Sequence, residues 1–293
     1  MPCARLPKSL AHVNPYLGLD GHPLRATSSW GLMMPANFDW RSPTEDDYLK
    51  HLDRPGFAWE FLRRNPAYQE DYETIVRGAA SDVGSGARQA KPSPGVGGSR
   101  FLVDPRLAAN QVAVFWRPEM LPTIVLLERA PERFSEARPL DVAQLGDDPA
   151  ERLGLDGRHV IVGNEVGEVR LWLRDGPQNE PLAIILPLDD DLPTRAEAAL
   201  RLWTRIVGRR ADHGREPLAL TRQRCDRLVL MLRALDGHLS EASYREIAEI
   251  LFGIRRLERE PWKTSSLRDQ TIRLVKGGVV LMRAGYRTLL RGR

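Results

Sequence analysis

The chain has 293 residues, of which 42% are hydrophobic and 28% are charged, a composition that excludes a disordered or fibrous protein. No apolar run is long enough to cross a membrane or to form a signal peptide, and two cysteines cannot build a disulfide framework. We therefore expect a cytoplasmic protein of about two domains, with no membrane partner.

Charge is distributed unevenly along the chain. The formal net charge is +4, but residues 201–293 hold 21 basic and 10 acidic residues, whereas residues 1–200 hold 22 and 29. The C-terminal part thus carries a net +11 and the remainder −7. Arginine supplies 38 of the 43 basic residues, a bias that GC-rich coding also produces, so the segregation by position is the informative feature. It predicts a surface for a polyanion.

Two stretches of the N-terminal third lack the signals of regular structure. Residues 1–37 show no sustained hydrophobic period and predict an irregular leader. Residues 79–99 are rich in Gly, Ser, Ala and Pro and predict a flexible linker. Within the linker, Gly84–Lys91 resembles a phosphate-binding loop only superficially, because no Gly precedes Lys91 and Pro92 follows it.

Residues 38–78 predict an N-terminal helical domain. Ser42 and Glu45 form the pattern of a capping box for a first helix, which Asp53-Arg54-Pro55-Gly56 would stop. Two further helices are expected over 57–64 and 67–77, the last ended by Gly78. A unit of this size has little core of its own. We therefore expect it to pack on a partner surface.

Residues 100–193 predict a small, mainly antiparallel sheet. Residues 168–174 alternate, apart from Trp172 on the otherwise polar face, which places Val169, Leu171 and Leu173 on the other face, and Asn164–Gly167 favours a hairpin. Five short β-prone runs are separated by Pro and Gly-Asp clusters: 112–116, 123–127, 159–162, 169–173 and 182–186. Asp189–Asp191 could hold a hard cation, but a polar loop before a helix also accounts for it.

Residues 194–293 predict a C-terminal helical bundle, so the fold class expected for the whole chain is α+β. Thr194 and Glu197 form a capping box for a helix to about Val207. The next three helices are expected over 222–235, closed by Asp236-Gly237; over 244–252, capped by Ser243 and stopped by Gly253; and from Ser265 or Ser266 to about Gly285, with a short helical turn at 286–290.

The last three helices follow the order of a helix-turn-helix unit, whose final helix enters the major groove of DNA. The connector, residues 253–265, exceeds the usual turn of 3–4 residues, so the unit would be a variant. Basic side chains recur along the last helix at spacings of 3 and 4, in one line, and their guanidinium forks suit phosphate and guanine. The candidate DNA-binding residues are Lys263, Thr264, Ser265, Ser266, Arg268, Arg273, Lys276, Arg283 and Arg287. A solvated basic face is the alternative.

Two regions resemble a proteobacterial family of two-domain transcriptional activators that control excision and transfer of integrative and conjugative elements. The first comprises Phe38-Asp39-Trp40-Arg41, Tyr48, residues 57–66 and Tyr68. The second comprises residues 244–248 and 251–253, Trp262, Leu267-Arg268-Asp269, residues 285–287 and Leu289-Leu290. The resemblance implies a DNA-binding, helix-turn-helix variant C-terminal domain and control by a small antiactivator. Gly277-Gly278 departs from the charged or small helix formers expected there.

Trp59, Arg63 and Arg64 are the candidate partner-binding residues of the N-terminal domain. Trp59 would form a small core with Phe61 and Leu62 or, alternatively, dock a partner. The two arginines would contact DNA or RNA polymerase, or carry solvated charge. No nucleophile–base pair or metal-ligand pattern is present, so no enzymatic activity, metal or cofactor is expected.

Taken together, these patterns predict a nucleoid-associated, sequence-specific transcriptional activator that binds double-stranded promoter DNA. RNA polymerase and a small antiactivator protein are the further expected partners. The alternative is a protein-interaction adaptor or antiactivator that uses the same C-terminal domain without reading DNA. The intact basic line favours the activator, because a module that binds only protein would not need it.

Overall fold

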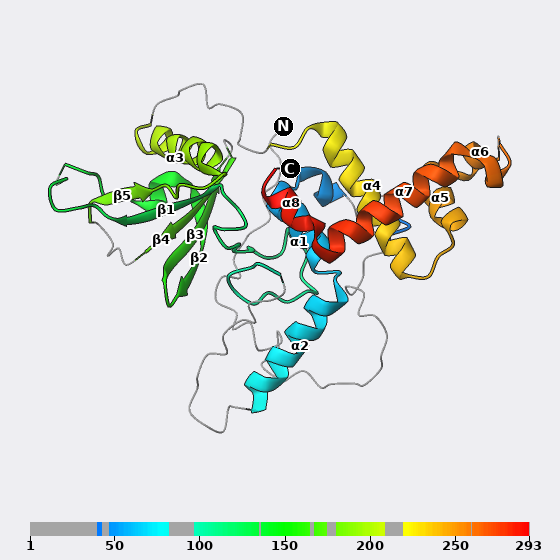
Figure 1. The fold of residues 1–293 in the computed structure, drawn as a ribbon, viewed down its shortest axis with the longest axis horizontal. Helices are drawn as coiled ribbons and strands as arrows, with labels where there is room; N and C mark the ends of the chain where they lie inside the picture. The colour runs from blue at the N-terminus through cyan, green and yellow to red at the C-terminus, as the bar shows by residue number, and fades with distance from the viewer. Residues whose placement is uncertain are drawn as a thin grey trace. The chain divides into compact units, whose positions relative to one another are not determined.

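The computed structural model describes residues 40–42, 47–81, 97–134, 136–164, 167–174, 180–208, 219–258 and 260–292 (Figure 1). The described residues within 117–208 form one compact unit, and those within 40–116 and 219–292 form the other. Helices and a small mixed sheet confirm the α+β class. The predicted leader and most of the predicted linker lie outside the described residues. No helix in the described part of the chain is long and apolar enough to cross a membrane.

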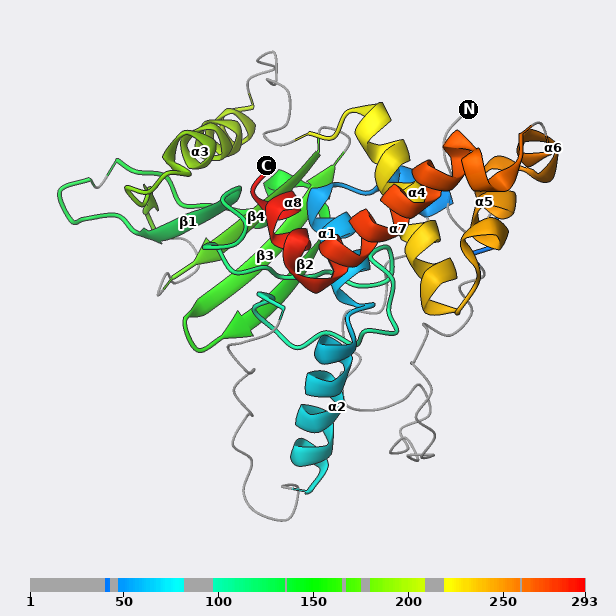
Figure 2. The ribbon, with the colours of Figure 1, turned by 45° about the vertical axis from the view of Figure 1, so that its right-hand side comes forward.

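The first unit is a five-stranded sheet with a helix on one face (Figure 2). Its strands are β1 (Ile124–Arg129), β2 (Asp147–Gly154), β3 (Gly157–Asn164), β4 (Gly167–Leu173) and β5 (Leu182–Ile185). They lie in the order β2-β3-β4-β1-β5, and only the β1–β4 pair is parallel. The predicted, mainly antiparallel sheet is therefore confirmed, as is the hairpin, since Asn164 pairs with Gly167.

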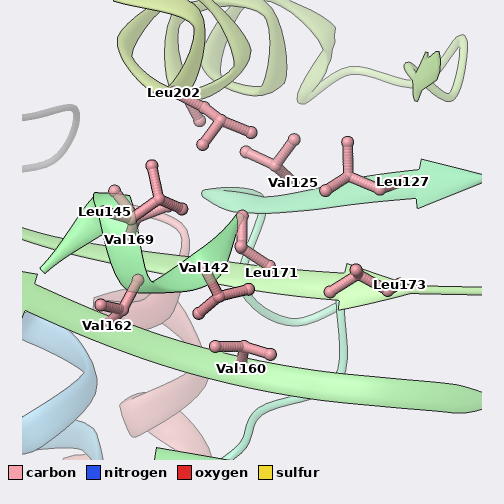
Figure 3. Packing of buried hydrophobic residues seen from close by; sticks show 11 residues of the cluster. Val125, Leu127, Val142, Leu145, Val160, Val162, Val169, Leu171, Leu173 and Leu202 are labelled. Atoms are coloured by element: carbon pink, nitrogen blue, oxygen red, sulfur yellow. The ribbon is translucent and has the colours of Figure 1, made fainter. Parts of the chain in front are cut away.

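The core of this unit lies between the sheet and α3 (Leu192–Ile206). Figure 3 shows Val169, Leu171 and Leu173 of β4 on the same side as Val160 and other apolar residues of the cluster, which also includes Leu202 of α3. The alternation expected over residues 168–174 is thus confirmed by the burial of every second residue. Helix α3, expected at the start of the C-terminal bundle, packs on the sheet instead.

Two local expectations are wrong, and one strand of the sheet was not expected. Residues 112–116, which belong to the other unit, form no strand; Trp116 makes an isolated bridge with Ser99. Strand β2 was not expected, because its sequence, DDPAERLG, is charged and lies exposed at the edge of the sheet. Helix α3 begins at Leu192 after Asp191, so Thr194 does not cap it. Asp189, in the same run of aspartates, accepts from the guanidinium of Arg195 at 2.9 Å.

The second unit consists of helices from both ends of the chain. The N-terminal segment gives a 3-10 helix (Asp47–His51), α1 (Arg54–Leu62) and α2 (Pro66–Ser81). The C-terminal segment gives α4 (Arg222–Leu239), α5 (Tyr244–Phe252), α6 (Ile254–Leu257), a 3-10 turn (Trp262–Thr264), α7 (Ser266–Val280), a π-helical segment (Leu281–Gly285) and α8 (Tyr286–Leu290). The expected caps at Ser243, with its capping box, and at Ser265 are confirmed.

Several expected helix boundaries differ in the structure. The first helix ends at His51, close to the expected Leu52, but the next begins earlier than expected, because the Asp53 carboxylate accepts from the Gly56 amide at 2.8 Å and caps α1. Gly78 lies within α2. Asp236-Gly237 lies within α4, where Asp236 is fully buried and a Cβ at Gly237 would come within 2.9 Å of Ile247. Gly285 belongs to the π-helical segment, which runs directly into α8.

Helix α1 is the central element of the second unit. Its residues Phe57, Trp59, Phe61 and Leu62, which lie on several sides of the helix, are completely buried. It packs against α8, the π-helical segment and α4. Trp40 also enters this unit, where it packs with Ala234, Ile247, Leu274 and Val275. The partner surface expected for the small N-terminal helices is therefore supplied by the chain's own C-terminal helices.

The glycine pair of α7 lies where this helix crosses α4. A Cβ at Gly278 would stand 2.8 Å from the backbone oxygen of Met231, whereas a Cβ at Gly277 would meet only the terminal methyl of the Met231 side chain. Gly278 is thus required by a close backbone approach, which explains the departure from helix-forming residues.

Gly278→Ala is expected to lower the free energy of unfolding by about 1–3 kcal/mol, because the backbone of α4 cannot move aside without disturbing the core. Gly277→Ala is the matched control: the flexible Met231 side chain can rotate away, and alanine regains about 1 kcal/mol of helix propensity. Urea unfolding of both variants tests this. Equal destabilisation of the two variants would contradict the close approach.

Candidate nucleic-acid interface

Helix α7 is anchored by its apolar face and its N-terminal cap. Leu274 and Val275 pack with residues of α4 and α5, and Leu267 packs near Leu257. The hydroxyl of Ser265 accepts from the Leu267 amide at 3.2 Å, which fixes the start of the helix. The opposite face of α7 is therefore left to solvent, and it is this face that carries the predicted basic residues.

The predicted DNA-binding residues fall into three groups. Lys263, Thr264, Ser266, Arg273, Lys276, Arg283 and Arg287 are exposed. Arg268 is half-buried and lies 3.5 Å from the carboxylate of Asp269. Ser265 is buried as the cap of α7, so its side chain does not face solvent. Exposed basic side chains at Arg273 and Lys276 form the central pair of the surface.

The basic line does not continue unchanged to the C-terminus. Residues 281–285 form a π-helical segment, in which hydrogen bonds span five residues and each turn holds more residues than in an α-helix. Arg283 and Arg287 are consequently rotated relative to the line that spacings of 3 and 4 predict from Arg273 and Lys276. The Arg287 guanidinium lies over the ring of Tyr286, 5.8 Å from its centre.

A groove between α4 and α7 brings further basic residues to this surface. It has a volume of about 600 Å³ and is lined by Thr221, Gln223, Arg224, Asp226, Arg227, Leu230, Gln270, Arg273 and Leu274. Arg224 and Arg227 of α4 thus lie in the same groove as Arg273 of α7. Guanidinium and amide side chains around one groove are suited to the phosphate oxygens of a nucleic acid backbone.

Sequence reasoning missed the contribution of α4 to this groove. Arg224 and Arg227 are three residues apart, on one side of α4 near its capped N-terminus, a spacing that is visible in the sequence. That spacing alone is also typical of an ordinary exposed helix face. Only the packing of α4 against α7 shows that it adjoins Arg273.

The three predicted partner-binding residues lie inside the second unit. Trp59, Arg63 and Arg64 are 0%, 2% and 1% exposed, so the folded unit does not offer their side chains to a partner. The prediction of an exposed docking site does not fit this burial. Trp59 is a core residue, as the interpretation with Phe61 and Leu62 had it, and donates from Nε1 to the Leu107 carbonyl at 2.9 Å. The arginines are neither solvated nor exposed to DNA.

Arg63 and Arg64 belong to a buried ion-pair network. Nε of Arg63 and Nη1 of Arg64 donate to one carboxylate oxygen of Glu60, at 2.6 and 2.7 Å. Arg64 also binds Asp236 of α4 through both of its remaining nitrogens, at 2.6 and 2.8 Å. The other Glu60 oxygen accepts from the Ala109 amide at 2.7 Å. Two carboxylates thus balance two guanidinium groups, which is the condition for burying charge.

The ionisation of this network follows from its geometry. Burial by itself would raise the pKa of the Glu60 carboxyl, but Arg63, Arg64 and the Ala109 amide outweigh that effect and hold the pKa below its ordinary value. For Arg64, burial opposes the charge, yet Asp236 and Glu60 raise the pKa of the guanidinium. A lowered Glu60 pKa stabilises the fold above the ordinary carboxyl pKa, and this contribution is lost in acid as the pH falls through the folded value.

The described residues contain no group of three or more His, Cys, Asp or Glu side chains placed to hold a metal ion. The chemistry available at the α4–α7 groove is instead the binding of a polyanion by guanidinium groups.

Comparison with protein families supports the same class of protein. Residues 185–291 match the model described as "T6SS, Transcription factor, DNA binding domain", and residues 39–92 match the "Proteobacterial transcriptional regulator-like domain". Residues 123–184 match a domain of unknown function. No curated protein matches the chain.

The family matches support a DNA-binding transcription regulator rather than an enzyme, with DNA as its partner. The regulator-like match contains α1 and α2, and the DNA-binding match contains α4 to α8, so the two matched regions share the core of the second unit.

Proposed function

We propose that this protein is a sequence-specific transcriptional activator that binds promoter DNA through α7 and the α4–α7 groove. The observation that carries the proposal is the groove itself, which joins Arg224 and Arg227 of one helix to Arg273 of another. The match to a transcription-factor DNA-binding domain covers all of these residues and supports DNA as the polyanion. The groove would hold the phosphate backbone, and the exposed face of α7 would meet base edges.

The proposed unit is a helix-turn-helix variant built from α4, α5 and α7. The three helices pack on one another, which supports this assignment. The connector between α5 and α7 holds α6 and the 3-10 turn, so it is longer than an ordinary turn. In this arrangement Lys263, Thr264 and Ser266 lie at the start of the reading helix, the position from which side chains of such units reach bases.

The proposed targets are genes for excision and transfer of an integrative and conjugative element. The resemblance of residues 38–68 and 244–290 to activators of such elements supports this target class. RNA polymerase and a small antiactivator are the protein partners that it implies. Since Trp59, Arg63 and Arg64 are buried, these partners would bind elsewhere on the chain.

Replacing Arg224, Arg227 and Arg273 together by alanine is expected to lower the magnitude of the slope of log K against log[salt] by about 2.7. Each phosphate contact contributes roughly 0.9 to this slope through counterion release. Fluorescence anisotropy with a promoter fragment from the element, over a range of salt concentrations, measures the slope.

The matched control replaces three arginines outside the groove: the exposed Arg77 and Arg129 and the half-buried Arg174, each of which pairs with a glutamate. It changes the net charge of the chain by the same amount. The control variant should retain nearly all of the slope. An equal loss in both variants would show that binding depends on overall charge, and no loss in either would overturn the proposed interface.

A protein-interaction adaptor that does not read DNA is the second candidate. It is favoured by the outer face of α3, where Leu200 and Trp203 are 64% and 48% exposed, because exposed apolar side chains side by side are typical of docking surfaces. An adaptor would show no preference for promoter DNA over unrelated DNA at any salt concentration, whereas the activator would.

A further inference from the structure

The junction between α7 and α8 depends on a residue from the other end of the chain. Asn65, which follows α1, donates from its side-chain amide to the backbone carbonyls of Met282 and Arg283, at 3.0 and 3.4 Å. Both carbonyls belong to the π-helical segment Leu281–Gly285. Met282 and Arg283 lie 217 and 218 positions after Asn65 in the sequence.

The π-helical segment is a place where such a donor matters. An extra residue in the turn shifts the helical hydrogen bonds, and buried carbonyls need a hydrogen-bond partner, which Asn65 supplies to Met282 and Arg283. Asn65 is 8% exposed, and water therefore has little access to replace it. The segment lies between Val280 and Tyr286, and it sets the direction in which α8 leaves α7.

Asn65 is itself held rigidly. Its side-chain oxygen accepts from the Ala67 amide at 2.9 Å, at the start of α2, and its backbone amide donates to the Leu62 carbonyl at 2.9 Å. The preceding residue, Arg64, is locked to Asp236 of α4 by two hydrogen bonds. Both ends of the Asn65 amide group are thus used: the oxygen for α2 and the nitrogen for the α7–α8 junction.

We infer that Asn65 is a positioning residue of the DNA interface: it holds the π-helical segment so that Arg283 and Arg287, beyond the straight part of α7, face the same DNA as Arg273. This inference rests on the proposed function. Arg283 lies in the π-helical segment and Arg287 in α8, and both are exposed. The regulator-like N-terminal segment would then shape the reading surface from within the same chain, without touching DNA.

The test uses Asn65→Asp in the full-length chain. Aspartate keeps the oxygen that accepts from Ala67 but removes both N–H donors and turns an acceptor toward the two carbonyls, so the contact with the α7–α8 junction is lost and replaced by repulsion. Gln69→Glu is the matched control, because it makes the same amide-to-carboxylate change in α2, where Gln69 donates to the Arg63 carbonyl at 2.9 Å. Asn65→Ser, whose short hydroxyl cannot reach both carbonyls, replaces Asn65→Asp if that variant does not fold.

Two measurements are made on each variant. Hydrogen–deuterium exchange without DNA should become faster over residues 281–290 in Asn65→Asp and stay unchanged in Gln69→Glu. In Asn65→Asp, the slope of log K against log[salt] for promoter binding should fall in magnitude by about 1.8, the value for two phosphate contacts. The double variant Arg283→Ala, Arg287→Ala should lose the same amount of slope. Adding Asn65→Asp to this double variant should cause no further loss.

The outcomes separate the two proposals. Unchanged exchange over residues 281–290, or a slope loss that adds to that of the Arg283–Arg287 variant, overturns the role of Asn65 while the groove still binds DNA. If the Arg224–Arg227–Arg273 variant matches its own control, the DNA interface fails and the positioning role fails with it. Faster exchange combined with the shared slope loss supports the inference.

Discussion

Replacing Arg64 by alanine is expected to lower the free energy of unfolding by about 3–5 kcal/mol, the usual cost of breaking a buried ion pair from one side. Asp236 would be left charged and completely buried, without the two hydrogen bonds that now compensate it. Glu60 would keep Arg63 as its partner, at 2.6 Å. The loss would fall mainly on the contact between α1 and α4.

Urea unfolding followed by circular dichroism measures this effect. Arg245→Ala is the matched control, because Arg245 pairs with Glu249 on the exposed face of α5, and a surface pair of this kind contributes less than about 1 kcal/mol. A second variant, Arg64→Met with Asp236→Leu, should recover part of the stability, since apolar residues can replace a buried pair. If Arg64→Ala were no more destabilising than Arg245→Ala, the buried network would not hold the N-terminal helices to α4.

The features that sequence predicts correctly here are those with local signals. The side chain of each of Ser243 and Glu246 accepts from the backbone amide of the other. The start of α5 is therefore fixed by two residues that are three positions apart. The alternation of apolar and polar residues over 168–174 requires only that one face of the strand be buried, and it predicts β4. The exposure of Arg273 and Lys276 on α7 follows from the helical period in the same way.

What sequence does not predict depends on contacts between distant positions. Arg64 and Asp236 are 172 positions apart, and each alone resembles an ordinary surface charge. The Asp236-Gly237 dipeptide is a turn signal, but burial against α1 and α5 keeps it helical. For the same reason the α4 side of the groove could not be foreseen from the spacing of its arginines.

The π-helical segment shows the same limit in the candidate site. Spacings of 3 and 4 over residues 273–287 predict one straight line of basic side chains only if the helix stays α-helical throughout. Asn65 stabilises a different backbone at residues 281–285, and no pattern within α7 or α8 records that contact. The composition of the surface was therefore predictable, but its shape was not.

Replacing Trp59 by alanine is expected to lower the free energy of unfolding by about 3–5 kcal/mol, because a completely buried indole leaves a cavity that the surrounding helices cannot fill. Trp59 packs edge-on against Tyr68, with 5.6 Å between ring centres, and its Nε1 donates to the Leu107 carbonyl. It therefore joins α1, α2 and the segment after them. Trp59→Phe should cost less, since it keeps most of the apolar volume.

Trp203→Ala provides the comparison within the same chain. Trp203 is 48% exposed on α3, so its removal should change the stability of the fold by no more than roughly 0.5 kcal/mol, while any protein partner of that face would lose affinity. Thermal unfolding of the three variants, with promoter binding measured below the transition, distinguishes the roles of the two tryptophans. A Trp59→Ala protein of unchanged stability that had lost a protein partner would instead return Trp59 to the docking role. The burial of its ring, and of every apolar side chain around it in α1, favours the structural role.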